Sequence, residues 1–139
     1  MRTYRIFIDE NLPKDLANGL NMLQKGQNGK NNISIEVVSI LEVFGRGAKD
    51  EDWIPEVGKN NGIVITQDYR IQTQKHQREL YLNNNVGILF INPPSKKGFS
   101  YWEMTKLLVN RWEEIIGIIR GTKAPFAFKC TAKTKFAKV

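Results

Sequence analysis

The sequence has few of the residues that stabilise disulfide-rich or zinc-dependent small proteins. Its 139 residues include one cysteine, Cys130, and one histidine, His76. A single cysteine cannot form an internal disulfide, and this pair cannot complete a zinc site made of cysteine and histidine ligands. The longest apolar runs are far shorter than the ~18 residues that a membrane-spanning helix needs. These absences exclude a disulfide scaffold and a zinc finger, and we expect no membrane partner.

The first residues also lack the pattern of a secretion signal. Arg2 and Arg5 are followed only by the apolar residues 6–8 before Asp9, which is too short for a signal-peptide core. We therefore expect a cytoplasmic protein. Hydrophobic residues make up 41% of the chain and charged residues 25%, close to globular averages, so an ordered core is expected.

Acidic residues are absent from the C-terminal segment. The whole chain has 21 Lys and Arg against 14 Asp and Glu, a net charge of +7. Residues 120–139 hold six of the basic residues and no acid, so the first 119 residues are almost neutral. This distribution excludes a uniformly basic, histone-like chain. We expect a single domain over 1–139, in which 122–139 is a basic C-terminal extension.

Short apolar segments alternate with segments of helical periodicity. The apolar segments 4–8, 33–38, 63–66 and 86–91 predict strands, and 12–23, 50–60, 72–84 and a long stripe over 104–119 predict helices. Strands separated by helices imply a three-layer α/β/α domain with a mainly parallel sheet. The alternation over 126–136 predicts a C-terminal strand or hairpin with a basic outer face.

Acidic residues follow three of the predicted strands. Asp9 and Glu10 come directly after the first strand, residues 50–52 begin the helix after the second, and Asp68 comes two residues after the third. If these strands are neighbours, their carboxyl ends bring the acids to one edge of the sheet. Carboxylates grouped in this way repel one another unless they hold a hard cation such as Mg²⁺ or Mn²⁺.

Each acid also has a structural alternative. Acids in a first helical turn complement the helix dipole, and Asp or Asn residues commonly cap helices. Asn11 can cap the helix that follows it. Pro55 favours Asp52 as the N-cap of the second helix, because the proline then falls at the third helical position; Asp50 remains free in the preceding loop.

The ordered combination of these segments resembles the PIN-like ribonuclease domains. The matching pieces are residues 7–12, 48–52 and 63–68, and the resemblance covers about residues 4–91. It is greatest to the compact, VapC-type toxins of bacterial toxin–antitoxin pairs. The resemblance implies an endoribonuclease that uses Mg²⁺ or Mn²⁺, with Asp9, Asp50 and Asp68 as its catalytic, metal-binding acids. It also implies a cognate antitoxin protein as partner, and a homodimer is left open.

The sequence departs from this family just after Asp68. Related domains often have a further acid two residues on, where Arg70 stands here. Glu10 or Glu79 completes the acidic set in two alternatives, and in a third the metal is held by three carboxylates and water. The arginine also leaves open a non-catalytic RNA-binding or protein-binding module on the same fold.

Basic and aromatic residues supply candidates for RNA binding. We expect phosphate contacts from four residues after Asp68 and three in the tail: Arg70, Lys75, His76, Arg78, Lys129, Lys133 and Lys135. A solvated helix face or a solubilising strand is the alternative. Tyr69 and Tyr81 are candidates for base stacking, and Trp53, Trp102 and Trp112 are expected in the core.

A phosphorelay receiver domain is a further alternative. Asp9 and Glu10 resemble its acidic pair, and residues 52–55 resemble the segment after a phosphoacceptor. A phosphoacceptor needs a buried strand directly before it, whereas residues 45–51 are polar and rich in glycine. The sequence therefore argues against a receiver and favours a metal-dependent endoribonuclease.

Overall fold

The computed structural model describes residues 2–139; Met1, which the expected domain includes, lies outside them. The described residues form one six-stranded sheet in the order β2-β1-β3-β4-β5-β6. Every neighbouring pair is parallel except the last, β5 with β6. The strands are β1 (Arg2–Ile8), β2 (Ile33–Ser39), β3 (Gly62–Thr66), β4 (Gly87–Ile91), β5 (Phe126–Cys130) and β6 (Ala137–Lys138).

Helices connect the parallel strands. They are α1 (Lys14–Lys25), α2 (Ile40–Phe44), α3 (Asp50–Lys59), α4 (Arg70–Thr73), α5 (Lys75–Asn83) and α6 (Tyr101–Gly121), with a 3-10 turn at Lys30–Asn32. The longest, α6, begins with a capping box in which Ser100 and Glu103 bond each other's backbone N–H. Such a box satisfies two of the N–H groups that have no partner within the helix.

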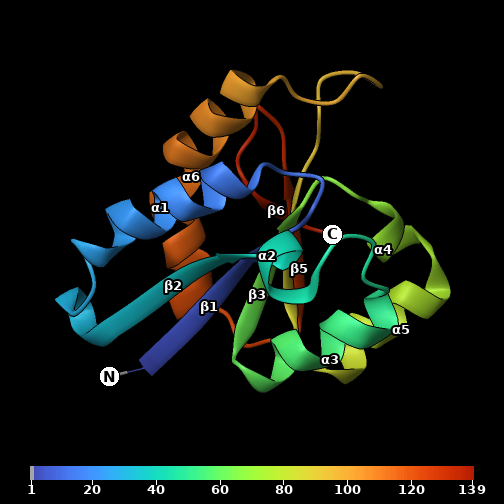
Figure 1. Cartoon of the computed structure of the whole chain (residues 1–139), viewed down its shortest axis with the longest axis horizontal. Coiled ribbons are helices and arrows are strands. Elements are labelled where there is room, and N and C mark those ends of the chain that lie inside the picture. Colours follow the sequence, from blue (N-terminus) through green and yellow to red (C-terminus); the bar gives the residue numbers. More distant parts are fainter. Residues whose placement is uncertain (1) are drawn as a thin grey trace.

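The helices cover both faces of the sheet. Figure 1 shows α1 and α6 on one face and α3, α4 and α5 on the other. Two buried clusters correspond to these layers: one joins α1 and α6 to the sheet, and the other joins α3 and α5 to it. The central strands β3 and β4 are buried along their whole length, as expected for strands covered on both sides. The expected α/β architecture with a mainly parallel sheet is confirmed.

Most predicted elements are present, with three changes of detail. The expected polar helix over 72–84 is divided into α4 and α5, because Gln74 has an extended backbone. The apolar periodicity beginning at Leu12 becomes helical only from Lys14, with Pro13 in the cap position. The C-terminal alternation forms a hairpin whose first strand, β5, is a member of the sheet.

Three aromatic or capping predictions are wrong. Trp102 is 69% exposed, because it lies on the outer side of the first turn of α6. Tyr81 is 3% exposed and therefore unable to stack on a base. Asp52 is not the N-cap of α3, because the carbonyl of Lys49 already accepts from the N–H groups of Asp52 and Trp53. The helix consequently begins at Asp50 and contains Pro55.

Within residues 2–139, no helix combines the length and the apolar character needed to cross a bilayer. The longest, α6, carries charged residues at Glu103, Lys106 and Arg111.

Candidate metal centre

The strand order places Asp9 beside the end of β3. Strand β1 pairs in parallel with β3, with Ile8 opposite Ile65, and the Asp9 N–H donates to the Ile65 carbonyl at 3.0 Å. Asp68 follows β3 by two residues. Both acids therefore lie at the carboxyl edge of the sheet, where ligands of open α/β folds bind.

Thr66 connects the two acids. Its side chain is fully buried, and its hydroxyl donates to Asp9 Oδ2 at 2.6 Å. The hydroxyl oxygen of Thr66 also accepts from the Asp68 N–H at 2.9 Å. The Asn11 side-chain amide nitrogen lies 3.4 Å from both Thr66 Oγ1 and Asp9 Oδ2. Sequence reasoning assigned no role to Thr66 and gave Asn11 only a capping role, which is wrong because Pro13 takes the cap position of α1. The one available signal was a hydroxyl residue at the end of an otherwise apolar strand.

Asp50 is the first residue of α3, not a loop residue as expected. Its carboxylate Oδ2 accepts a short hydrogen bond from the side-chain amide of Gln77 in α5. Helices α3 and α5 pack together on one face of the sheet, and this bond fixes the direction of the Asp50 side chain. Gln77 carried no signal in the sequence, because a glutamine in a polar helix is ordinarily a solvent-facing residue.

The electrostatics show that the three aspartates are close enough to interact. Burial is the largest cause of the raised pKa of Asp9; hydrogen bonds from Thr66 and Glu10 oppose it, and repulsion from Asp68 and Asp50 adds to it. Burial likewise raises the pKa of Asp50, with the Gln77 bond opposing and repulsion from Asp68 contributing. Three carboxylates from different segments thus share one electrostatic environment, as the sequence pattern predicts.

Asp68 differs because Arg70 neutralises it. The Arg70 guanidinium donates from Nε to Asp68 Oδ1 and from Nη2 to Oδ2, each at 2.8 Å, and its backbone N–H also bonds Oδ1. These bonds hold the pKa of Asp68 below its usual value. Arg70, which stands where related domains often have an acid, therefore forms a bidentate ion pair with the acid before it.

The candidate fourth acids are engaged elsewhere. Glu10 is exposed, and its carboxylate accepts from the Gly47 N–H at 3.1 Å. This bond links the end of β1 to the glycine-rich loop before α3. Glu79 lies 3.9 Å from Lys75, one helical turn away on α5. Glu10 and Glu79 therefore each have a partner other than the three aspartates.

The other predicted RNA-binding residues of α5 also have partners. His76 Nε2 is 3.1 Å from Glu51, and Arg78 donates to the Gln72 carbonyl at 2.9 Å, which closes the turn between α4 and α5. Arg78 therefore has a structural role, whereas Lys75 and His76 are exposed.

The tail reaches the site through Lys129. Its Nζ lies 4.6 Å from the centre of the Tyr69 ring, and Tyr69 directly follows Asp68. Because β5 is parallel to β4, its carboxyl end lies on the same sheet edge as the aspartates. Lys133 and Lys135 are exposed in the segment between β5 and β6. The carboxyl end of β5, the segment that follows it and the acids thus share one end of the molecule.

The donor chemistry fits a hard divalent cation, although the side chains are not gathered into a closed cage. Carboxylate oxygens are the ligands that Mg²⁺ and Mn²⁺ prefer. Across residues 2–139, no three His, Cys, Asp or Glu side chains are arranged tightly enough to hold a metal ion. The ion pair with Arg70 uses both oxygens of Asp68. A cation bound by all three acids therefore requires Asp68 to leave Arg70.

Comparison with known proteins agrees with this geometry. Residues 4–93 match a family described as "PIN like domain", a segment that contains most of β1, all of β2 to β4 and all three aspartates. No curated protein and no solved structure matches the chain. PIN-like domains are usually nucleases and generally use divalent metals, which supports nuclease function at a coarse level. Since the match spans more than half of the chain, the protein belongs to the PIN-like domain family.

Proposed function

We propose that the protein is a metal-dependent endoribonuclease that cleaves RNA phosphodiester bonds. The observation that carries this proposal is the grouping of Asp9, Asp50 and Asp68, which come from three segments and repel one another at one sheet edge. Asp68 is paired with Arg70, but the buried Asp9 and the half-buried Asp50 have no recorded cationic partner among residues 2–139. Burial of such carboxylates is unfavourable, so the group is better explained by a ligand cation than by fold stability.

The residues have distinct parts in this proposal. Asp9, Asp50 and Asp68 hold Mg²⁺ or Mn²⁺, and Thr66 fixes the orientation of Asp9 by its 2.6 Å hydrogen bond. When bound, the cation supplies an activated water and neutralises charge on the phosphate oxygens. Arg70, once released from Asp68, is placed to contact a phosphate next to the site.

RNA is the proposed substrate because cations border the acids. Lys129 lies over Tyr69, and Lys133 and Lys135 extend from the same end of the sheet. Such residues contact phosphates irrespective of sequence, whereas an exposed tyrosine face stacks on unpaired bases. Tyr69 is half-buried and packs edge-on against Phe90, with the two ring centres 4.9 Å apart, so its position is fixed before RNA binds.

RNA cleavage with and without the acids tests the proposal. The purified protein is incubated with single-stranded RNA and Mg²⁺ or Mn²⁺, and initial rates are compared for Asp9→Asn, Asp68→Asn and the control Asp52→Asn. Asp52 is exposed in the first turn of α3, and its side chain has no recorded hydrogen bond or ion pair within residues 2–139. We expect the first two variants to lose at least about 100-fold in rate and the control to keep it. Cleavage that survives both would reject the assigned site.

We further propose that the nuclease is the toxin of a toxin–antitoxin pair. The resemblance of residues 7–12, 48–52 and 63–68 to such toxins supports this. The partner would be an antitoxin encoded beside it, with a small DNA-binding domain. Induced expression should stop bacterial growth, co-expression of the neighbouring protein should restore it, and Asp9→Asn should be harmless. Normal growth during expression of active nuclease would contradict the toxin role.

One observation favours a second function, a non-catalytic RNA-binding module. Arg70 supplies the positive charge at Asp68 that a metal otherwise supplies. Calorimetric titration with Mn²⁺ separates the two functions. Stoichiometric binding that Asp9→Asn abolishes supports the nuclease, whereas no binding at millimolar Mn²⁺, together with intact RNA binding, supports the module.

A further inference from the structure

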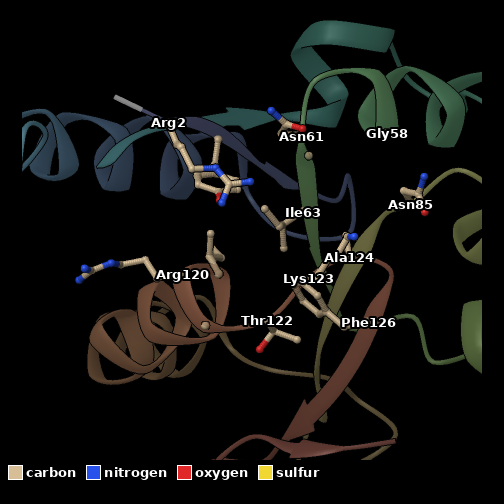
Figure 2. Close-up of a pocket in the computed structure, with 14 residues that line it drawn as sticks. Arg2, Gly58, Asn61, Ile63, Asn85, Arg120, Thr122, Lys123, Ala124 and Phe126 are labelled. Atoms are coloured by element: carbon tan, nitrogen blue, oxygen red, sulfur yellow. The ribbon is translucent and has the colours of Figure 1, made fainter. Parts of the chain in front are cut away.

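A cavity lies at the opposite edge of the sheet from the acids. It has a volume of about 700 Å³, within the range of small-molecule sites. Figure 2 shows residues around it from the amino ends of β1 and β3, from the turn before β4, and from the segment between α6 and β5. Strand β1 separates Arg2 from Asp9 by seven residues, or about 23 Å. The cavity is therefore distinct from the candidate metal centre.

The cavity carries positive charge without a compensating acid. Arg2, Arg120 and Lys123 line it, and its lining contains no Asp or Glu. All three side chains are exposed, and none belongs to an ion pair recorded for residues 2–139. Uncompensated cations around a concave surface concentrate anions there.

Arg2 is held in place at the cavity wall. Its guanidinium carbon lies 5.4 Å from the centre of the Tyr4 ring, at a distance typical of a cation–π contact. Figure 2 shows the Arg2 side chain extending from the start of β1 toward the cavity, and the Arg120 side chain extending outward from α6 at the rim. Arg2 is therefore the cation best placed to meet a ligand.

The lining also has an apolar part. Tyr4, in β1, and Ala124, just before β5, line the cavity and are half-buried, so each exposes apolar surface to it. Hydroxyl and amide groups of Thr122, Asn61 and Asn85 line the same space and make no recorded hydrogen bond to the described chain. A cavity with cations, free polar groups and an apolar surface suits a ligand that has both an anionic and a flat apolar part.

Bare backbone forms another part of the wall. A side chain at Gly62 would come within 2.5 Å of the Val57 carbonyl, and one at Gly58 within 2.1 Å of the Asn84 carbonyl. Gly58 lets the end of α3 pack closely against the turn before β4, and Gly62 lets the start of β3 pack against Val57 of α3.

We propose that this cavity binds a nucleotide, with its phosphate near Arg2 and Lys123 and its base against the apolar wall. The nucleotide has two sources with the same chemistry, a free mononucleotide or one residue of an RNA strand. Phosphate alone would use only the cations, and a nucleoside alone only the wall, so a nucleotide is expected to bind more tightly than either. This proposal is independent of the nuclease function, because it requires no aspartate and no metal.

Calorimetric titration of the full chain with AMP in EDTA tests the proposal, alongside adenosine and inorganic phosphate. EDTA removes metal-dependent binding at the acids. The test variant is Arg2→Gln with Lys123→Gln, and the matched control is Lys25→Gln with Lys96→Gln, which removes the same charge from exposed positions outside the cavity. Arg120 is kept because it also complements the C-terminal end of the α6 dipole.

We expect AMP to bind one site, to bind at least tenfold more tightly than adenosine or phosphate, and to lose at least tenfold in affinity in the test variant only. Unchanged thermal unfolding confirms that this variant folds. No AMP binding to the unaltered protein, or equal losses in both variants, overturns the proposal. If phosphate binds as tightly as AMP, the base adds no affinity, and the proposed contact between the base and the apolar wall is overturned.

A five-residue oligoadenylate in the same buffer distinguishes the two sources. Binding that is tighter than that of AMP and weakened by the test variant assigns the cavity to an RNA strand. Binding that is weaker than that of AMP assigns it to a free nucleotide. The same titration of Asp9→Asn should give an unaltered affinity; loss of binding there would mean that AMP occupies the acidic site and would overturn the proposal.

Discussion

The hydroxyl of Thr66 donates a 2.6 Å hydrogen bond to the carboxylate of Asp9, across 57 residues of sequence. Both side chains are buried at the carboxyl ends of adjacent parallel strands. Because the same hydroxyl oxygen also accepts from the Asp68 N–H, a single threonine determines the relative positions of two candidate ligands. This arrangement gives the first prediction.

Thr66→Val should weaken metal binding while Thr66→Ser retains it. Loss of the hydroxyl leaves the buried Asp9 carboxylate without its strongest side-chain donor. We expect Mn²⁺ affinity to fall by about 10–100-fold, as for other residues that orient metal ligands. The free energy of unfolding at pH 7 should fall by about 1–3 kcal/mol, the cost of removing a hydrogen bond to a charged group. Calorimetry and urea unfolding measure the two effects, and an unchanged Mn²⁺ affinity in the valine variant would contradict the role of Thr66.

Arg70→Gln should have the opposite effect on metal binding. The variant removes the guanidinium that engages both oxygens of Asp68. We expect Mn²⁺ to bind several-fold more tightly without RNA, because a competing cation is gone. The matched control is Lys75→Gln, since Lys75 is paired with Glu79 on the same helix, α5, and not with Asp68. Weaker Mn²⁺ binding in Arg70→Gln than in this control would show that Arg70 supports the metal centre instead of competing with it.

Lys133→Gln with Lys135→Gln should weaken RNA binding and reduce its dependence on salt. The slope of log K against log salt is negative, and loss of two phosphate contacts should reduce its magnitude by about 1.4 for single-stranded RNA. Point substitutions are needed because β5 is part of the sheet and contains the buried Phe126 and Cys130, so that deleting the tail would damage the fold. Fluorescence anisotropy at several salt concentrations measures the slope, with Lys25→Gln and Lys96→Gln as the charge-matched control. Equal slopes in both variants would indicate general attraction instead of contacts from the tail.

Cys130 should react slowly with thiol reagents in the folded protein. Burial is the main cause that raises the pKa of its thiol from its ordinary value of 9.0 to about 11. At pH 8 the folded protein therefore has about 100-fold less thiolate than the unfolded chain, and only the thiolate reacts. Reaction with a chromogenic disulfide should be at least about 100-fold faster in urea. Comparable rates in buffer and urea would contradict the burial of this residue.

The same shift predicts a loss of stability at alkaline pH. The folded state favours the neutral thiol, so this contribution to stability is complete below about pH 9 and is lost as the pH rises toward about 11. A shift of two units corresponds to about 3 kcal/mol. The difference in unfolding free energy between the unaltered protein and Cys130→Ala should therefore shrink over this interval. A difference that stays constant from pH 8 to pH 11 would contradict the shift.

Two helical glycines should respond to alanine in opposite directions. In Gly58→Ala the new methyl group would lie 2.1 Å from the backbone carbonyl of Asn84, which cannot move aside easily, and we expect a loss of about 1–3 kcal/mol. Gly117, inside α6, has nothing within 4 Å of the same position. Gly117→Ala should therefore stabilise by about 0.5–1 kcal/mol, because alanine restricts the unfolded chain. Thermal unfolding measures both; stabilisation by Gly58→Ala would show that α3 and the turn before β4 are not in close contact.

Local patterns in the sequence were sufficient for most of the fold. The apolar segment ending at Ile8 and the stripe ending at Ile119 reveal a strand and a helix because periodicity depends only on neighbours in the chain. The position of Asp9 and Asp68 after parallel strands followed in turn, since the ends of such strands meet at one edge. Local signals were weaker where two residues can serve as the N-cap of one helix. The position of Pro55 alone favours Asp52 as the cap of α3, whereas the structure has Lys49 in that position.

The sequence by itself therefore determined the α/β class, the order of the strands and helices along the chain, and the acids that follow the strands. The tertiary structure decided which side chains complete the site and which surface they face. Thr66 bonds Asp9 only because β1 and β3 are neighbours, and Gln77 meets Asp50 only because α5 packs on α3. Trp102 is exposed because it points away from the side of α6 that carries Met104, which packs in the core against the sheet. Periodicity predicts the elements, but contacts between distant residues depend on how those elements pack, and packing is a property of the whole chain.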